Sequence, residues 1–538
     1  MGLLQALGWL LAGPLLLVVC LIIYGFHPLQ RWRYRKFPGP RPRWLIGNLL
    51  EIHTEGQEGA AERWVAEYGP LFLIWLGGFP VLMTADPSLA KKVLARPARH
   101  KIWILHEGQE KDYEDHTLFF ANGERWRASR AAWQPFFSRQ SLQGHAGFMA
   151  RSAEALCGLL GSAASSGQQV DIWKSLQSLT LDVVGTVAFG VDFNTLASPK
   201  ASGQAADGKP AAAAQFAAAE GQAGSRARGL RSASTDALLS AVRTVFEVCG
   251  PAQPLFGLCF MFPEAEPLIR WLINRRPNSI FRRELGARQV VKAVGAELLQ
   301  VSRQGDAPAP AANGHAAAQQ QHAGQEAGQR KGQEAGGRPS TVGSGSFLAN
   351  VGRHTGKTIE GEVLLDDAWA TNQATTFLVA GYETTANAIT FTVYLLARNP
   401  DKEAKLLAEI DAFGRNRVPT LDHIEAHFPY AAAVLKESMR LYAPSITLMR
   451  EAPAGSEWQL GGYAVPPGTA LQVSMHAMQR SPELWHDPTA FIPERFVAGS
   501  SEAEEFTFRL LPGQVPLKTK VLITQGPIDG VHVTVHRR

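Results

Sequence analysis

The stretch FLVAGYETTANAITFTVYLLARNP, residues 377–400, is the most informative part of this chain. Its apolar side chains recur at helical spacing, so it predicts a long apolar helix that ends before Pro400. The middle of this helix carries small or polar residues, at Gly381, Glu383, Thr384 and Thr385. A glutamate buried there would be unfavourable unless it is paired or used.

Glycine followed by consecutive threonines weakens a helix locally and can leave room for a ligand or water. We therefore interpret Glu383 and Thr384 as an acid–alcohol pair that faces a cofactor. The alternative is a polar stripe that only touches another helix.

A second segment, AAAVLKESMRLYAP at residues 431–444, places Glu437 and Arg440 on one helix face, where they can pair. The same spacing occurs at Glu124 and Arg127, so the pattern is weak by itself. Its weight comes from its position between the long helix and the PERF sequence that contains Arg495.

The long helix resembles the central helix of the cytochrome P450 family, the haem-thiolate monooxygenases. Ala380, Gly381, Glu383 and Thr384 match that family's Ala-Gly-x-Glu/Asp-Thr motif. The resemblance implies that Ala380 and Gly381 lie against the cofactor. It also implies that Thr384 hydrogen-bonds the iron-bound dioxygen while Glu383 helps to deliver protons.

Other segments resemble the same family in the usual order. The resemblance implies that Glu437, Arg440 and Arg495 form a charged cluster that braces the segment leading to the haem. Trp126 and Arg130, in GERWRASR, fit a W-x-x-x-R helix that hydrogen-bonds a haem propionate, for which arginine is well suited. An ordinary surface arginine beside a half-buried tryptophan is the alternative. Arg450, in LMREAP, takes the place of another propionate-binding arginine.

The resemblance runs from about Pro38 to the last residue. It implies a mainly α fold with a small β region, a cytochrome P450 fold preceded by a single N-terminal transmembrane helix. The short runs LFLIWL and PVLMTA indicate strands, so we expect a small sheet within residues 44–83. The implied cofactors are haem b, O2 and electrons from NADPH, delivered by NADPH-cytochrome P450 reductase. The implied reaction inserts one oxygen atom into an apolar small-molecule substrate.

The first 30 residues contain no Asp, Glu, Lys or Arg, and an almost unbroken apolar run is followed by a basic, aromatic cluster. This pattern predicts a transmembrane anchor at residues 1–27 and a basic, proline-rich hinge at 28–43. A cleaved signal peptide is the alternative. We expect a single-pass protein in a membrane, by family the endoplasmic reticulum, with a cytosolic catalytic domain at 44–538.

Composition agrees with this organisation. The net charge of +5 is compatible with a membrane surface or with nucleic acid, but it is too mild to argue for either, and an ordinary soluble surface is the alternative. We expect no nucleic-acid partner. Four cysteines without paired spacing favour a reducing compartment. Residues 199–229 and 305–346 are rich in Ala, Gly and Gln, and we interpret them as low-complexity insertions in surface loops.

The axial ligand of the family is missing. After PERF the family carries F-x-x-G-x-R-x-C-x-G, whose cysteine thiolate binds iron and favours O–O cleavage. Here Phe496 is followed by VAGSSEAEE, and no cysteine occurs after Cys259, so no metal ligand is assigned. The apparent deletion lies near residues 497–505. His476 is a poor substitute, because histidine would alter the oxygen chemistry.

Two interpretations of this deletion remain. Good family sequence on both sides of the gap favours an incomplete copy of a working enzyme, produced by a skipped exon or a mis-assigned intron. The alternative is a haem-free, catalytically inactive protein that is anchored to a membrane and binds a lipid or another partner.

Overall fold

The computed structural model describes the ranges 25, 27–95, 117–118, 121, 123–190, 192–193, 195–197, 237–238, 240–245, 258–259, 261–262, 265–305, 347–352, 354–359, 362–414, 417–445, 447–453, 455, 458–497 and 532–533. The predicted anchor and both predicted insertions lie almost wholly outside these residues. So does the apparent deletion, apart from Val497. Within the described residues, none of the helices combines the length and the apolar character needed to cross a bilayer.

The described part is mainly helical. The α-helices are α2 (Pro28–Arg33), α3 (Leu49–Tyr68), α4 (Pro87–Leu94), α6 (Gly123–Trp133), α7 (Arg139–Ser166), α8 (Ile172–Val184), α12 (Glu266–Arg275), α13 (Ser279–Gly305), α14 (Phe347–Gly352), α15 (Asp367–Arg398), α16 (Pro400–Phe413), α17 (Leu421–His427), α18 (Pro429–Leu441) and α19 (Met475–Gln479). Short 3-10 or π turns are η1 (Gln134–Phe137), η2 (Gly185–Phe189), η3 (Thr195–Ala197) and η7 (Pro493–Phe496).

The strands are few and short. They are β1 (Leu71–Leu76), β2 (Phe79–Thr84), β3 (Val170–Asp171), β4 (Lys357–Ile359), β5 (Glu362–Leu365), β6 (Thr447–Glu451), β7 (Trp458–Leu460), β8 (Tyr463–Val465), β9 (Ala470–Ser474) and β10 (His532–Val533). The expectation of a mainly α fold with a small β region is therefore confirmed.

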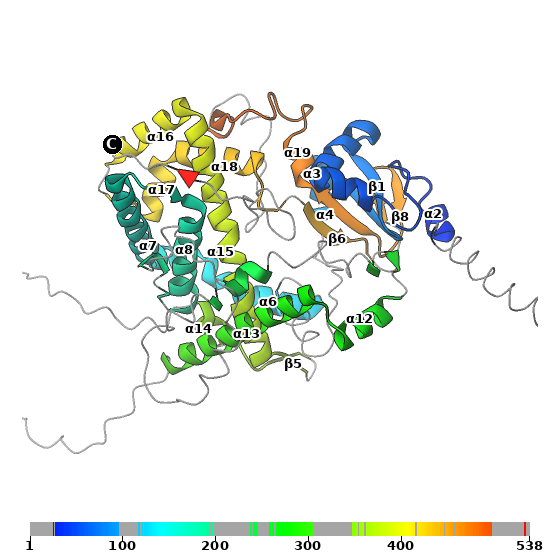
Figure 1. The fold of residues 1–538 in the computed structure, drawn as a ribbon, viewed down its shortest axis with the longest axis horizontal. Helices are drawn as coiled ribbons and strands as arrows, with labels where there is room; N and C mark the ends of the chain where they lie inside the picture. The colour runs from blue at the N-terminus through cyan, green and yellow to red at the C-terminus, as the bar shows by residue number, and fades with distance from the viewer. Residues whose placement is uncertain are drawn as a thin grey trace, which may run out of the picture.

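The largest sheet has the strand order β1-β2-β9-β6. β1 and β2 form an antiparallel hairpin, β2 pairs in parallel with β9, and β9 pairs antiparallel with β6. β1, β2 and β9 are buried along nearly their whole length, which explains why β1 and β2 have nearly continuous apolar sequences. In Figure 1 this sheet, with α3 and α19, lies to the right of the helical body.

The strand prediction for residues 44–83 was wrong in its first half. Residues Leu49–Tyr68 form helix α3, which is kinked where Gly56 takes a φ of 74°. Only Ala60, Ala61 and Trp64 of this helix are buried. Because so narrow a face is buried, the sequence of this helix shows little apolar periodicity at helical spacing. Its glycines therefore resemble turn signals between strands.

Helix α15 runs through the helical body, and it packs against α8, α13 and α18 (Figure 1). Its N-terminus is capped by Asp366, whose carboxylate accepts a hydrogen bond from the backbone N–H of Trp369 at 2.6 Å. It ends at Arg398 and α16 begins at Pro400, as the sequence predicted. Helices that precede and follow α15 in the chain are therefore arranged around it.

Candidate functional site

The middle of α15 presents a stripe that neighbouring helices leave uncovered. Ala380 and Thr385 are exposed, whereas Gly381, Glu383 and Thr384 are half-buried. The turns on either side are largely buried, from Trp369 to Thr375 and from Ala386 to Ala388. The expectation of a buried glutamate was therefore wrong: Glu383 is only half-buried, and the fully buried residue in this turn is Tyr382.

Thr384 is hydrogen-bonded within its own helix. Its hydroxyl donates to the backbone carbonyl of Ala380 at 2.6 Å, a bond that joins two members of the stripe. α15 is one unbroken helix through this turn, so the threonines do not disrupt it. The hydroxyl oxygen still has lone pairs to accept a further hydrogen bond.

Gly381 has a packing role that the sequence did not reveal. A Cβ atom added to Gly381 would lie 2.8 Å from Cγ2 of Val184 on α8. The glycine therefore allows α15 and α8 to approach closely. It was predicted to make room for a ligand, but on this side the room is filled by another helix.

Tyr382 lies at the α8 side of α15. Burial, with a further contribution from the charge of Glu383, raises the pKa of Tyr382 to about 12, against an opposing effect of the Arg243 charge. The Thr180 hydroxyl on α8 donates to the Tyr382 carbonyl at 2.8 Å. Glu383 thus lies between the buried hydrogen bond from Thr180 to Tyr382 and the uncovered stripe.

Glu437 and Arg440 on α18 form a buried, bidentate ion pair, with nitrogen–oxygen distances of 2.7 and 2.8 Å. Arg495 of η7 approaches the same carboxylate at 3.4 Å, and the backbone N–H of Ile492 donates to it at 2.9 Å. The structure thus brings together the three charged residues that the sequence singled out.

The arginines of this cluster also hold the preceding loop. Arg440 donates to the carbonyls of Gln479 and Pro488, both at 2.7 Å, and to that of Ala490 at 3.1 Å. Arg495 donates to the carbonyl of Asp487 at 3.0 Å. Almost every donor is used, which offsets the unfavourable burial of these charges. The cluster therefore fixes the path of the chain up to Val497.

Glu124 and Arg127 repeat the same spacing in a different setting. They form an ion pair on α6, but both side chains are more than half exposed. Exposed pairs of this kind contribute only about 0–1 kcal/mol. Burial, which the spacing does not encode, separates this pair from the one on α18.

Trp126 and Arg130 lie together on α6, the tryptophan half-buried and the arginine exposed. Within the described part of the chain, Arg130 has no ion pair. Arg450 lies on β6, where it donates to its neighbour's carbonyl, that of Met449, at 2.8 Å, and burial lowers the pKa of Arg450. Trp126 and Arg130 on α6 and Arg450 on β6 thus lie on different elements from the stripe of α15.

Two hydrogen bonds that the sequence did not predict attach α6 to α15. The indole N–H of Trp369 donates to the Ser129 hydroxyl at 2.7 Å, and that of Trp133 donates to the Gln373 side chain at 3.0 Å. Each pair is separated by 240 residues. No local sequence pattern encodes a contact between residues so far apart. The one available signal was that a buried tryptophan usually needs a hydrogen-bond acceptor for its indole N–H.

The described cysteines lie away from this site in different surroundings. Cys157 is exposed on α7, and Cys259 is buried in an apolar cluster with Ile269, Ile273 and Phe281. Cys20 and Cys249 lie outside the described residues. His476 is buried, and its Nε2 is 2.8 Å from a carboxylate oxygen of Glu62, so it is engaged elsewhere. Among the described residues, no cluster of His, Cys, Asp or Glu is arranged to hold a metal ion.

The family profile described as Cytochrome P450 matches residues 37–209 and 346–512, more than half of the chain. The chain belongs to the cytochrome P450 family. It is 26% identical to thromboxane-A synthase of Macaca fascicularis over 485 residues, which cover 88% of this chain and 80% of that protein.

Other relatives carry different names. The chain is 25% identical to cytokinin hydroxylase of Arabidopsis thaliana over 486 residues, covering 85% of this chain and 77% of that protein. It is 23% identical to cytochrome P450 3A41 of Mus musculus over 489 residues, which cover 91% of this chain and 81% of that protein. These names include both a synthase and a hydroxylase, so similarity at this level fixes the family and not one reaction.

The residues present fit the haem of a cytochrome P450 on one side only. The small, uncovered surface at Ala380 and Thr384 suits a flat apolar group, and Arg130, which is exposed and has no ion pair in the described part of the chain, can bind a carboxylate. The donor set does not fit, because the thiolate that characterises the family has no counterpart after Cys259. This disagreement limits what the chain as written can do.

Proposed function

We propose that the complete form of this cytochrome P450 is a haem-dependent monooxygenase that inserts one oxygen atom from O2 into an apolar substrate. The observation that supports this proposal most directly is the uncovered stripe of α15, where Ala380 and Thr384 lie between two largely buried turns of the helix. The haem would supply the redox chemistry, as cofactors do for O2 activation in general.

In this proposal the residues of the protein bind the haem and orient the groups around it. Ala380 keeps the surface of α15 low, so that a flat group can approach it, while Gly381 lets α8 pack closely against α15. Glu383 and Thr384 place a carboxylate and a hydroxyl beside that surface, two groups that can take part in proton transfer. Arg130 and Arg450 supply cationic donors for carboxylates, and Trp126 packs beside the first of them.

No reaction step is assigned to the chain as written, because the axial thiolate is absent from it. We interpret the chain as an incomplete copy. The buried cluster of Glu437, Arg440 and Arg495 supports this interpretation, since it holds the backbone in place up to Val497, the point at which the family loop would begin.

The test begins with transcripts across the codons for Phe496 to Phe506. The chain as written and any longer form that carries the cysteine are then expressed, and haem per polypeptide and the ferrous–CO absorption spectrum are measured. We expect a thiolate-type spectrum in the longer form alone. A Cys157→Ser variant of the chain as written is the control, since it tests whether an exposed thiol recruits haem. If every transcript joins as written, the monooxygenase proposal fails.

A haem-free binding protein is the second candidate, and the lack of any cysteine after Cys259 is the observation that favours it. It predicts that the chain as written is the only form, unfolds cooperatively and purifies without haem. The transcript sequences and the haem content per polypeptide therefore separate the two candidates.

A membrane location is part of the proposal. On α2, Leu29 is 83% and Trp32 is 66% exposed, and the guanidinium of Arg35 lies 4.3 Å from the centroid of the Trp32 ring. Exposed aromatic and basic residues of this kind are typical of a membrane interface. We propose that residues 1–27 anchor the protein in the endoplasmic reticulum, with NADPH-cytochrome P450 reductase as its electron donor.

A further inference from the structure

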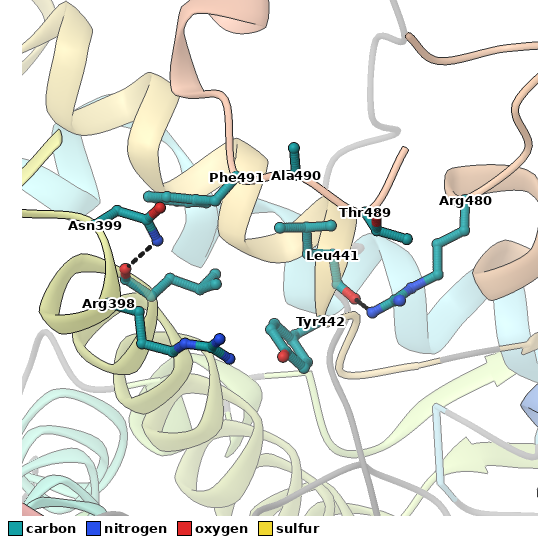
Figure 2. Close-up of a pocket in the computed structure, with 9 residues that line it drawn as sticks. Arg398, Asn399, Leu441, Tyr442, Arg480, Thr489, Ala490 and Phe491 are labelled. Carbon is teal, nitrogen blue, oxygen red and sulfur yellow. Dashed lines mark hydrogen bonds between the residues drawn. The ribbon is translucent and has the colours of Figure 1, made fainter. Parts of the chain in front are cut away.

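A cavity of about 320 Å³ lies at the C-terminal ends of α15 and α18. Its walls come from Leu395, Arg398 and Asn399 of α15 and its cap, from Leu441 and Tyr442, from Arg480, and from the loop 489–491 (Figure 2). None of these residues is acidic. The cavity is separate from the stripe at Ala380 and Thr384, and its size is that of a small-ligand site.

Arg480 is a desolvated cation in one wall. One terminal nitrogen donates to the carbonyl of Leu441 at 2.7 Å, while Nε is buried and has no hydrogen-bond partner among the residues that the structure describes. Burial lowers the pKa of Arg480. Among the described residues it forms no ion pair, although Glu62 and Glu58 influence it from a distance. A buried guanidinium with an unused donor is unfavourable unless something completes it.

Arg398 lies across the cavity from Arg480, with Tyr442 between them (Figure 2). It donates to the hydroxyl of Tyr394 at 2.8 Å and has no ion pair within the described residues. The ring of Tyr442 is fixed by stacking on Phe391, with centroids 4.8 Å apart. Two arginines without carboxylate partners therefore face one cavity across a rigid aromatic ring.

The helix ends do not neutralise these charges. Arg480 bonds the last carbonyl of α18, and both helices direct their negative ends here. Each helix C-terminus carries roughly half a negative charge, so together they offset about one of the two positive charges. The cavity keeps a net positive charge, and the planar guanidinium forks suit a carboxylate or phosphate group.

We propose that this cavity binds an oxyanion, a carboxylate or a phosphate, held between Arg398 and Arg480. The group comes from a free small molecule. The proposal is independent of haem binding and of the monooxygenase activity.

The test is hydrogen–deuterium exchange of the full chain in detergent micelles, in potassium phosphate and in potassium chloride at equal ionic strength. A ligand slows local opening by about one plus its concentration over Kd, so phosphate at ten times Kd slows exchange about tenfold. We expect this slowing at the amides of 395–399 and 441–442. Arg398→Gln should remove it, and since the Arg398 side chain is exposed the variant keeps the fold.

Arg417→Gln is the matched control, because Arg417 is also exposed and stacks on an aromatic ring, Phe413, at 4.7 Å. It should leave the phosphate response unchanged. Absence of slowing in the parent chain, or equal slowing in Arg398→Gln, overturns the proposal.

Discussion

Arg495 and Glu437 are separated by 58 residues, yet Nε of Arg495 lies 3.4 Å from a carboxylate oxygen of Glu437, and both side chains are almost completely buried. Arg440 completes the cluster from the same helix as Glu437. One carboxylate therefore stands between two buried guanidinium groups, and it also accepts the backbone N–H of Ile492.

Replacing Glu437 with glutamine should destabilise the protein strongly. The variant leaves Arg440 and Arg495 buried without a counter-charge, and breaking a buried pair in this way costs about 3–5 kcal/mol. Urea unfolding measures the change. Glu124→Gln is the matched control, since it breaks an exposed pair of the same spacing, and it should change the free energy of unfolding by less than about 1 kcal/mol. Equal effects of the two variants would contradict the burial argument.

The Gly381→Ala variant tests the contact between α15 and α8. The added methyl would lie 2.8 Å from Val184, and overpacking of this kind destabilises a protein by about 1–3 kcal/mol. Gly147→Ala on α7 is the control, because nothing lies within 4 Å of the added atom. Alanine is the better helix former by about 0.5–1 kcal/mol, so that variant should be stabilised. A neutral or stabilising Gly381→Ala would show that the helices can separate without loss.

Glu494 links η7 to α16, and its stability contribution should depend on pH. Burial would raise the pKa of Glu494, but hydrogen bonding to Lys405 and the charges of Lys402 and Lys405 lower it to about 2. The pKa is thus depressed in the folded state. The contribution is fully present above the unfolded pKa of about 4.3 and is lost as the pH falls toward 2.

Glu494→Gln should therefore be less stable than the parent at pH 6 by about 1 kcal/mol, a figure reduced for solvent screening because the side chain is partly exposed. The difference should vanish near pH 2. Urea unfolding at several pH values measures it, and a difference that is constant with pH would rule out the carboxylate charge as its source.

The sequence predicted those features that repeat locally. The periodicity of residues 377–400 and Pro400 predicted α15 and its end, and the apolar runs of β1 and β2 indicated strands, although not that they pair as a hairpin. Helix α3 was missed because only a narrow face of it is buried. The reason for Gly381 was also missed, since Val184 lies far away in the chain and only the packing of α8 brings it near.

The candidate site shows the same division. Motif and spacing selected Glu437, Arg440 and Arg495, and the structure joins them. The pairing of Ser129 with Trp369 could not be foreseen, because serine has no distinguishing pattern within a helix and its partner is 240 residues away. The exposure of individual side chains could not be predicted from the sequence either. Glu383 and Tyr382 are neighbours, and only the position of α8 decides which of them is buried.

The hydrogen bond between Ser129 and Trp369 gives the last prediction. Both side chains are fully buried, so Ser129→Ala leaves the indole N–H without an acceptor, at a cost of about 1–3 kcal/mol. Ser162→Ala is the control, because that exposed hydroxyl only bonds back to the carbonyl of Gly158 in its own helix. Hydrogen exchange of α6 should also speed up in Ser129→Ala, since this bond attaches the helix that carries Trp126 and Arg130 to α15. If unfolding is destabilised but exchange in α6 is unchanged, the bond stabilises α15 alone, and another contact must hold Arg130 in place.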